Sequence, residues 1–285
     1  MIKQTKGERV FNVFNVIFLT LLSICAFYPM YYVLMASFSQ SGQLMAHSGL
    51  LLTPAGFSTS AYEVIIDNKN IWTGYGNTLF IVIIGTLVSL ALTSMAAYPL
   101  SRKTFGLRNF FMMMITFTMM FSGGLIPRFL VVKDVGLYDS IWSLILPVVI
   151  NTTNLIIMRT AFAAIPESLE ESAKIDGAND LIIYVRIIMP LAKATLAVLA
   201  LYYGVAYWNS WFTASIYLRS RDKFPLQLIL REILIANENE NTDNELMSES
   251  IKYAAIIVST VPILCAYPFL QRYFVKGVMI GAVKG

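Results

Sequence analysis

The sequence predicts an all-α, polytopic membrane protein with six transmembrane helices and a cytoplasmic loop of short helices. Two observations of composition and patterning support this fold class. Of the 285 residues, 57% are hydrophobic and only 13% are charged, whereas soluble domains are about half apolar and a quarter charged. The apolar residues also gather in long runs without Asp, Glu, Lys, Arg or His, which is typical of helices surrounded by lipid. No alternating pattern indicates the strands of a barrel.

The first run follows a short basic N-terminus. Val10–Ser37 is longer than the roughly 20 apolar residues that cross a bilayer, and it is too long for the core of a signal peptide. Gly123, Gly124 and Pro127 break the third predicted span near its end, and Pro147 lies within the fourth. The remaining spans are predicted at Asn77–Ser101, Phe110–Pro127, Ile141–Met158, Ala194–Leu218 and Tyr253–Gln271.

The connecting segments predict the orientation. The basic N-terminus, the basic turn Arg102–Asn109 and the basic tail carry the positive charge that marks the cytoplasmic side. We therefore expect a cell-membrane protein with both termini in the cytoplasm: residues 1–9 as N-terminus, 10–275 as one transmembrane domain and 276–285 as tail. The outer connections are predicted at Phe38–Gly76, Arg128–Ser140 and Arg219–Lys252, the last with an amphipathic piece at Phe224–Ile235.

Several classes of site are excluded by residue type. Cys25 and Cys265 lie inside apolar runs and are expected to pack there rather than form a disulfide or hold a metal. His47 is the only histidine, so no metal site and no catalytic group is predicted. The phosphate loop GxxxxGK[ST] is missing, and the dipeptide Gly-Lys does not occur. We expect this chain to bind no cofactor, and no basic run with interleaved aromatics suggests nucleic acid.

The polar stretch Glu171–Ala194 is predicted to form two short helices broken at Gly177. Pro166 suits the first turn of the first helix, because proline has no N–H to lose there. Gly177 can adopt the left-handed conformation that ends a helix. In the second helix an apolar stripe is expected before Pro190 stops it, at Leu181, Tyr184, Val185 and Ile188.

This stretch resembles the EAA loop that marks the membrane subunits of bacterial ATP-binding-cassette (ABC) importers. The residues in register are Glu171, Ala173, Asp176, Gly177, Ala178, Ile187 and Pro190. The sequence departs from the pattern at Ser172, Tyr184, Met189 and Ala194, where the missing second proline leaves the entry into the next span less sharply set.

The resemblance implies that segment 165–193, the coupling loop, docks in a cleft of a separate ATPase dimer that binds the ATP and Mg²⁺. Glu171 would pair with a basic group there, and Asp176 would cap the second helix or meet the ATPase. Ala173 and Ala178 would allow close approach. The expected coupling residues are Glu170, Glu171, Ser172, Ala173, Asp176, Gly177, Ala178 and Pro190.

The tail FVKGVMIGAVKG resembles the C-terminus of carbohydrate-type permeases, particularly the maltose-type subunit whose tail reaches between the two ATPase subunits. The residues expected to contact the ATPase are Gly277, Gly281, Lys284 and Gly285. Glycines would let an extended backbone pass through a narrow cleft. The alternative is a basic end near anionic lipid.

The segment Ala206–Phe212 contains a Trp-Asn pair that resembles the fifth span of sugar-type permeases. A polar group in the membrane tends to face other helices or a water-filled cavity. Candidates for the substrate pathway are Trp208, Asn209, Trp211, Asn151 and Asn154. The alternative is that the Asn residues join helices and the Trp residues anchor the chain at the interface. Pro225-Leu226-Gln227 and Ile280–Gly285 are similar to the branch that handles oligosaccharides.

The resemblance thus implies a permease subunit of a heteromeric ABC importer. Its partners would be a second homologous permease, an ABC ATPase dimer, an extracellular solute-binding lipoprotein, a carbohydrate substrate and the lipid bilayer. The alternative is an ion-coupled secondary transporter of a small polar solute, which normally carries ionisable residues inside the membrane. The six predicted spans contain no Asp, Glu, Lys, Arg or His, which favours an outside source of energy. An enzyme would need convergent titratable groups, and none is found.

Overall fold

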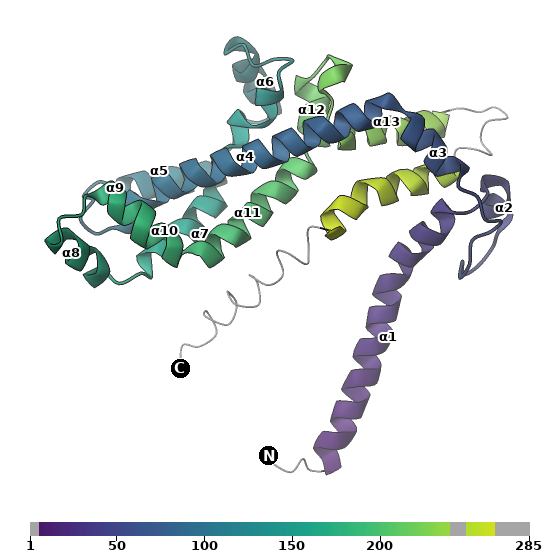
Figure 1. Cartoon of the computed structure of the whole chain (residues 1–285), viewed down its shortest axis with the longest axis horizontal. Helices are drawn as coiled ribbons and strands as arrows, with labels where there is room; N and C mark the ends of the chain where they lie inside the picture. Colours follow the sequence, from purple (N-terminus) through teal and green to yellow (C-terminus); the bar gives the residue numbers. More distant parts are fainter. Residues whose placement is uncertain (1–5, 240–248, 266–285) are drawn as a thin grey trace. The chain divides into compact units, whose positions relative to one another are not determined.

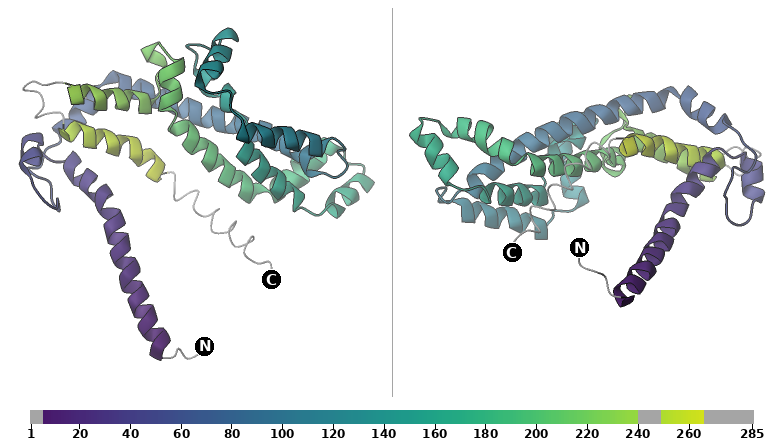
Figure 2. Two further views of the ribbon diagram at one scale, coloured as in Figure 1. Left: turned by 180° about the vertical axis from the view of Figure 1, so that it is seen from behind. Right: turned by 60° about the horizontal axis from the view of Figure 1, so that its bottom comes forward.

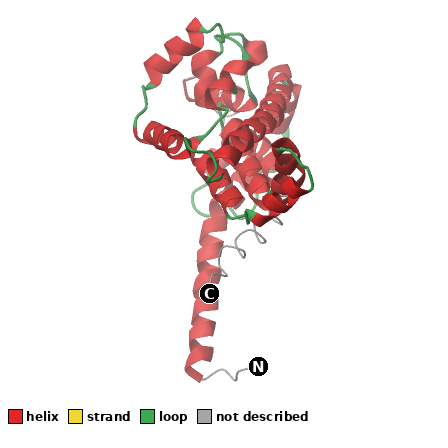
Figure 3. Cartoon of the chain, turned by 90° about the vertical axis from the view of Figure 1, so that its left-hand side faces the viewer, coloured by secondary structure: helices red, strands yellow, loops and turns green. Residues whose placement is uncertain are grey.

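The computed structural model describes residues 6–239 and 249–265, and these residues form helices and no strands (Figure 3). An isolated bridge joins Ser39 to Phe57. The all-α prediction is therefore confirmed for the described part of the chain.

Helices follow one another along the whole described chain. They are α1 (Lys6–Ser37), α2 (Ser41–Ala46), α3 (Ser60–Asp67), α4 (Lys69–Ser101), α5 (Arg108–Met120), α6 (Leu125–Asp134), the 3₁₀ turns η1 (Ile141–Leu144) and η2 (Leu146–Val148), α7 (Thr152–Ala163), α8 (Ser168–Ile175), α9 (Asp180–Ile183), the π-helical turn η3 (Tyr184–Ile188), α10 (Met189–Leu191), α11 (Lys193–Trp208), α12 (Trp211–Tyr217), the 3₁₀ turn η4 (Arg221–Lys223) and α13 (Leu226–Asn239). Residues 249–265 form a further helix.

Two helices are long and apolar enough to cross a membrane by themselves, residues Gly7–Ser37 of α1 and the whole of α4. Three further segments reach that length only as bent pairs: α5 with α6 at 117°, η1–η2 with α7 at 50°, and α9–α10 with α11 at 80°. The described residues thus offer two spans, or up to five if each bent pair crosses once. The predicted sixth span, Tyr253–Gln271, continues outside the described residues, so six spans stays a prediction.

The third predicted span is interrupted where its glycines lie. α5 ends at Met120, and Gly124 has a φ of 83°, a conformation that glycine adopts without steric cost. α6 then begins at Leu125 and holds Pro127 in its first turn, where proline is tolerated. The predicted loop at Arg128–Ser140 is therefore wrong up to Asp134, because these residues continue α6.

The fifth predicted span is also interrupted, at its polar residues. α11 ends at Trp208 and α12 begins at Trp211. Between them, Asn209 donates its side-chain N–H to the carbonyl of Val205 at 2.9 Å. Such side-chain bonds to the backbone compete with the helical ladder and favour a helix end.

The described residues divide into two compact units, the first formed by residues 6–68, 232–239 and 249–261. Within it, Ser250 of the helix 249–265 donates its hydroxyl to the carbonyl of Ser39 at 2.6 Å, and Ser41 bonds Ser250 at 3.0 Å. The rings of Tyr32 and Tyr253 meet edge to face at 5.8 Å. This unit is thus joined by polar side chains between segments far apart in the sequence.

The second unit contains residues 69–231 and is arranged around α4. α7 and α11 pack along α4, as both views show (Figures 1 and 2). Small residues make this packing close: a Cβ placed on Gly85 would lie only 2.8 Å from the ring of Tyr207. Farther along the same face, Ser89, Thr93 and Ala97 are fully buried. Their spacing of four residues puts them on one stripe of the helix.

Candidate functional site

The coupling loop folds as two short helices joined by a tight turn at Gly177. Gly177 has a φ of 81°, the left-handed conformation predicted for it. Its N–H donates to the carbonyl of Lys174 at 3.0 Å, and the N–H of Ala178 donates to the carbonyl of Ala173 at 2.9 Å. This pair of bonds is a Schellman motif, which ends α8. The predicted break at Gly177 is confirmed.

The residue that caps α9 is Asn179. Its side-chain oxygen accepts the N–H of Ile182 at 2.8 Å, which satisfies a donor left free at a helix start. Asp176, which was expected either to cap this helix or to meet the ATPase, instead occupies the C-cap position of α8. Its carboxylate therefore does not cap α9.

The second half of the coupling loop differs from its prediction. The turn η3 is π-helical, which adds a residue per turn and rotates the buried face. Ile183 and Ile188 are buried, whereas Leu181 and Val185 are 68% and 53% exposed, so the predicted stripe is wrong for those two. The helical segment ends at Leu191, one residue after Pro190, and the chain bends by 80° before α11 begins at Lys193, so the predicted stop at Pro190 is confirmed to within one residue.

α8 has one buried and one exposed face. Glu170 and Ala173 are buried, whereas Glu171, Ser172 and Asp176 are exposed. Ile175 is 87% exposed at the C-terminal end of the helix.

Glu170 forms a buried ion pair with Arg102, the residue that follows α4. Arg102 Nη2 lies 2.5 Å from Glu170 Oε1, and the two side chains are only 8% and 10% exposed. Arg102 also donates from Nη1 to the carbonyl of Phe162 in α7 at 3.0 Å. The hydroxyl of Tyr98 donates to Glu170 Oε2 at 3.4 Å. These contacts connect α8 with the end of α4 and with α7. They also place the Glu170 carboxylate in the interior of the chain.

A second contact ties the other half of the coupling loop to α4. The hydroxyls of Ser94 and Tyr184 are 2.6 Å apart, and the rings of Tyr98 and Tyr184 lie 5.4 Å apart. Both halves of the loop are therefore held by the last turns of the same long helix.

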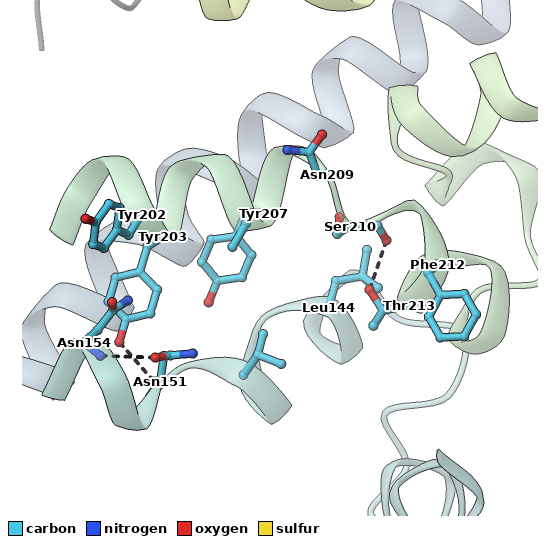
Figure 4. Close-up of a pocket in the computed structure, with 12 residues that line it drawn as sticks. Leu144, Asn151, Asn154, Tyr202, Tyr203, Tyr207, Asn209, Ser210, Phe212 and Thr213 are labelled. Atoms are coloured by element: carbon cyan, nitrogen blue, oxygen red, sulfur yellow. Dashed lines mark hydrogen bonds between the residues drawn. The ribbon is translucent and has the colours of Figure 1, made fainter. Parts of the chain in front are cut away.

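A cavity of about 400 Å³ lies farther along the second unit, between the α7 and α11 segments (Figure 4). Asparagine, tyrosine, serine and threonine side chains supply its polar groups, and no Asp, Glu, Lys, Arg or His is among the described residues that line it. The lining residues are Leu144, Val148, Asn151, Asn154, Tyr202, Tyr203, Ala206, Tyr207, Asn209, Ser210, Phe212 and Thr213.

Two tyrosines of the cavity are fixed from behind by hydroxyls of α4. The Tyr203 hydroxyl lies 2.7 Å from Thr93 Oγ1 and accepts the N–H of Asn151 at 3.0 Å (Figure 4). The Tyr207 hydroxyl lies 2.8 Å from Ser89 Oγ. Asn151 caps α7 by accepting the N–H of Asn154 at 3.1 Å. α4 thus contacts both regions: its hydroxyl groups bond the cavity tyrosines, and its C-terminal end contacts the coupling loop.

The structure brings only some of the predicted pathway residues together. Asn151, Asn154 and Asn209 line the cavity, whereas Trp208 and Trp211 do not. Trp208 is buried, and Trp211 stacks against Arg231. The tyrosines at positions 203 and 207 were missed, although their spacing of four residues matches that of Ser89 and Thr93 in another apolar run. The predicted tail residues Gly277, Gly281, Lys284 and Gly285 lie outside the described residues.

Asp139, in the loop between α6 and η1, has a strongly shifted pKa and lies outside the predicted spans. Asp139 accepts the backbone N–H groups of Arg219 and Ser220, each at 2.9 Å, and the Ser220 hydroxyl at 2.5 Å. Lys223 Nζ lies 3.1 Å from its carboxylate. The bonds from Ser220 and then Arg219 hold the pKa of Asp139 well below its usual range. Asp139 therefore joins two loops as a carboxylate.

Metal chemistry finds no support in the described residues. No group of three His, Cys, Asp or Glu side chains lies close enough to hold an ion there, and Cys25 and Cys265 are free and exposed. Their exposed positions on apolar helices suit contact with lipid or another subunit.

Bent apolar helices, a polar loop and a neutral cavity are features expected of a membrane transport component, and similarity to known proteins identifies the family. Residues 89–280 match the family described as "Binding-protein-dependent transport system inner membrane component". The chain therefore belongs to this family, and the resemblance found in the coupling loop is confirmed.

Relatives match along nearly the whole chain. The "Polygalacturonan/rhamnogalacturonan transport system permease protein YtcP" of Bacillus subtilis (strain 168) is 42% identical over 98% of this chain and 99% of its own. "Protein LplC" of the same organism is 40% identical over 99% and 97%. A chain from the "Crystal structure of a bacterial ABC transporter involved in the import of the acidic polysaccharide alginate" aligns with a TM-score of 0.88 and 33% identity, over 96% of this chain and 100% of that chain. The first of these similar proteins is named as a transport system permease, and the solved structure is that of an ABC transporter.

Proposed function

We propose that this chain is one permease subunit of a heteromeric ATP-driven importer and forms half of a translocation pathway for an oligosaccharide of acidic sugars. The acidic substrate is suggested by two similar proteins, one named for polygalacturonan and rhamnogalacturonan and one solved in a transporter of alginate. The observation that carries the proposal is that one helix, α4, holds the coupling loop at its end and the cavity tyrosines along its length.

The coupling loop is the proposed contact with the ATPase dimer. The exposed face of α8, with Glu171, Ser172 and Ile175, would enter a cleft of that partner. Glu170 would not contact the ATPase itself. Its buried ion pair with Arg102 would instead hold α8 rigidly against the end of α4. ATP binding can move the permease only if the two states of the partner hold this helix differently. ATP and Mg²⁺ would bind to the ATPase, since this sequence has no phosphate loop.

The neutral cavity is the proposed pathway surface. Sugar hydroxyls exchange hydrogen bonds with amides and hydroxyls, and the tyrosine rings offer apolar faces to sugar C–H groups. A neutral wall suits a surface inside a membrane, because an unpaired charge there is energetically expensive. Asn151, Asn154, Asn209 and the tyrosines at 203 and 207 are the proposed lining groups.

The remaining partners follow from the family. A second homologous permease would complete the pathway, and an extracellular binding lipoprotein would deliver the substrate. Both termini and the coupling loop would lie in the cytoplasm, with the tail residues Gly277 to Gly285 near the ATPase. The two loops that Asp139 joins would then lie on the extracellular side of the membrane.

The experiment is to co-express the importer, purify it through a tag on this chain, and reconstitute it in vesicles. We expect an ATPase and a second permease to co-purify. Uptake of trigalacturonate should require ATP on the cytoplasmic side and should continue when a protonophore removes the proton gradient. An ATPase partner that binds but does not hydrolyse ATP is the control. Uptake by this chain without ATP, driven by an ion gradient, would establish the secondary transporter instead.

A further inference from the structure

The neutral cavity leaves the charge of an acidic sugar unmatched. No Asp, Glu, Lys, Arg or His is among its described lining residues, so it can bind hydroxyls but offers no counter-ion to a carboxylate. If the proposed function is right, a cation elsewhere on the path must meet the carboxylates of the oligosaccharide.

Arg231 of the second unit lies on an aromatic surface. Cζ of Arg231 lies 3.6 Å from the ring centroid of Trp211. Trp211 begins α12, and its neighbours Ser210, Phe212 and Thr213 line the cavity. Trp211 is therefore adjacent in sequence to lining residues of the cavity, although its own ring does not line it.

The position of Arg231 is fixed by the buried face of α13. Leu226 donates its N–H to Thr78 Oγ1 of α4 at 2.8 Å, and the side chain of Ile229 lies against Gly74. Leu228 and Leu230 are also buried. Since the preceding turn is anchored in the core, the exposed Arg231 projects from a rigid element.

Four carboxylates of this unit already pair with other cations. The carboxylates of Asp139, Glu167, Glu170 and Asp180 pair with Lys223, Lys103, Arg102 and Lys174. A guanidinium that lies flat on an indole has its N–H groups in its own plane, where they can bind a second, planar partner. A carboxylate is the anion that fits this fork of N–H groups with two parallel bonds.

We infer that Arg231, stacked on Trp211, is a binding site for the carboxylate of a uronate residue in the transported oligosaccharide. The indole holds the guanidinium in place and offers apolar surface to the sugar ring. Sugar hydroxyls are then bound by the neutral cavity one or more rings away. This inference rests on the proposed function, and it adds the group that distinguishes an acidic from a neutral saccharide.

The test compares a charged and an uncharged substrate in the reconstituted importer. Trigalacturonate and its fully methyl-esterified form differ in the carboxylates and share the sugar rings. We expect Arg231→Gln to lower trigalacturonate uptake about tenfold or more, because a charge-assisted bidentate contact is lost, and to leave uptake of the ester within about twofold. Arg231→Lys keeps the charge without the fork and should give an intermediate loss.

Arg219→Gln is the matched control, since it removes another exposed cation from the same unit, and it should change neither uptake. Equal losses for acid and ester would make the Arg231–Trp211 stack a structural brace and overturn the inference. Unchanged acid uptake in both Arg231 variants would also overturn it. A wild-type importer that carries only neutral oligosaccharides would instead refute the acidic substrate proposed above, independently of the variants.

Discussion

The two stretches of α4 that hold the functional regions use opposite chemistry. At the coupling end, a buried ion pair joins Arg102 to Glu170. Along the cavity, the contacts are between neutral hydroxyls, Thr93 with Tyr203 and Ser89 with Tyr207. Both sets of contacts are buried and both are made to the same helix, so the difference does not come from exposure.

The difference is explained by what each contact must do. A buried charge without its partner is strongly destabilising, so the ion pair permits one arrangement of α8 and makes alternatives costly. A hydroxyl both donates and accepts, and it can exchange partners for a smaller penalty. A rigid connection at the coupling loop and adaptable contacts at the cavity would let a fixed displacement of α8 change the cavity wall.

The largest effect is expected at the ion pair. Arg102→Ala or Glu170→Ala leaves a buried charge unpaired and should destabilise the chain by about 3–5 kcal/mol. The measurement is the yield and melting temperature of the purified complex. Lys103→Ala is the matched control, because Lys103 and Glu167 form a neighbouring pair at 4.0 Å that is 76% and 51% exposed, and such pairs contribute about 0–1 kcal/mol.

The exchanged double variant Arg102→Glu with Glu170→Arg sharpens this test. If the pair acts as a unit, the double variant should recover part of the lost stability and of the ATP-dependent uptake. Losses that simply add would show that the two residues act independently and that no rigid connection exists between α4 and α8.

The coupling loop was largely predictable from sequence, and the cavity was not. The Asp176-Gly177 turn depends on local chemistry, since only glycine adopts its left-handed conformation freely, and a local pattern can reveal it. The ion pair joins residues 102 and 170, and the cavity joins side chains of α7, η1, α11 and α12. Such groupings depend on packing between distant segments, so Trp208 and Trp211 were chosen by type although they face elsewhere.

The helix breaks illustrate the same limit. Gly124 and the Asn209-Ser210 pair were visible as polar or flexible points inside apolar runs, but hydropathy averages over them. Proline was a mixed guide: Pro127 lies in the first turn of α6, where the missing N–H is tolerated, whereas Pro190 lies one residue before a helix ends. Composition predicts the number of apolar segments better than it predicts where each one bends.

The next largest effect is expected where α4 and α11 pack most closely. A methyl group at Gly85 would lie 2.8 Å from the ring of Tyr207, so Gly85→Ala must displace the ring and strain its bond to Ser89. We expect a loss of about 1–3 kcal/mol and reduced uptake. Gly204→Ala is the matched control in the same interface: its methyl group would meet Thr86 at 3.7 Å, an ordinary contact, and should be neutral or slightly stabilising. Equal melting temperatures for the two variants would contradict this packing.

A smaller effect is expected from the cavity hydroxyls. Tyr203→Phe removes the group that pairs with Thr93 and accepts the N–H of Asn151, which should lower stability by about 1–2 kcal/mol. Tyr202→Phe alters the neighbouring residue of the same cavity, which is 48% exposed, and should leave stability unchanged. If Tyr203→Phe proved as harmful as Glu170→Ala, the contrast between adaptable and rigid contacts would be wrong.

The smallest effect is expected at Asp139, whose ion pair with Lys223 is more exposed than that of Glu170, at 25% and 34%. Asp139→Asn should destabilise the complex by no more than about 1 kcal/mol near neutral pH. Because the folded-state pKa of Asp139 is depressed, its contribution is fully present above the ordinary Asp range near 3.9 and is lost as the pH falls below it.

The melting temperatures of wild type and Asp139→Asn should therefore differ at pH 7 and converge as the pH is lowered below about 4. Lys223→Met is the companion variant, since it removes the cation and leaves the bonds from Ser220 and Arg219 to the carboxylate. It should cost less than Asp139→Asn, because those bonds are the larger causes of the depressed pKa. If the difference in melting temperature between wild type and Asp139→Asn stays constant with pH, the charge of the Asp139 carboxylate does not contribute to stability.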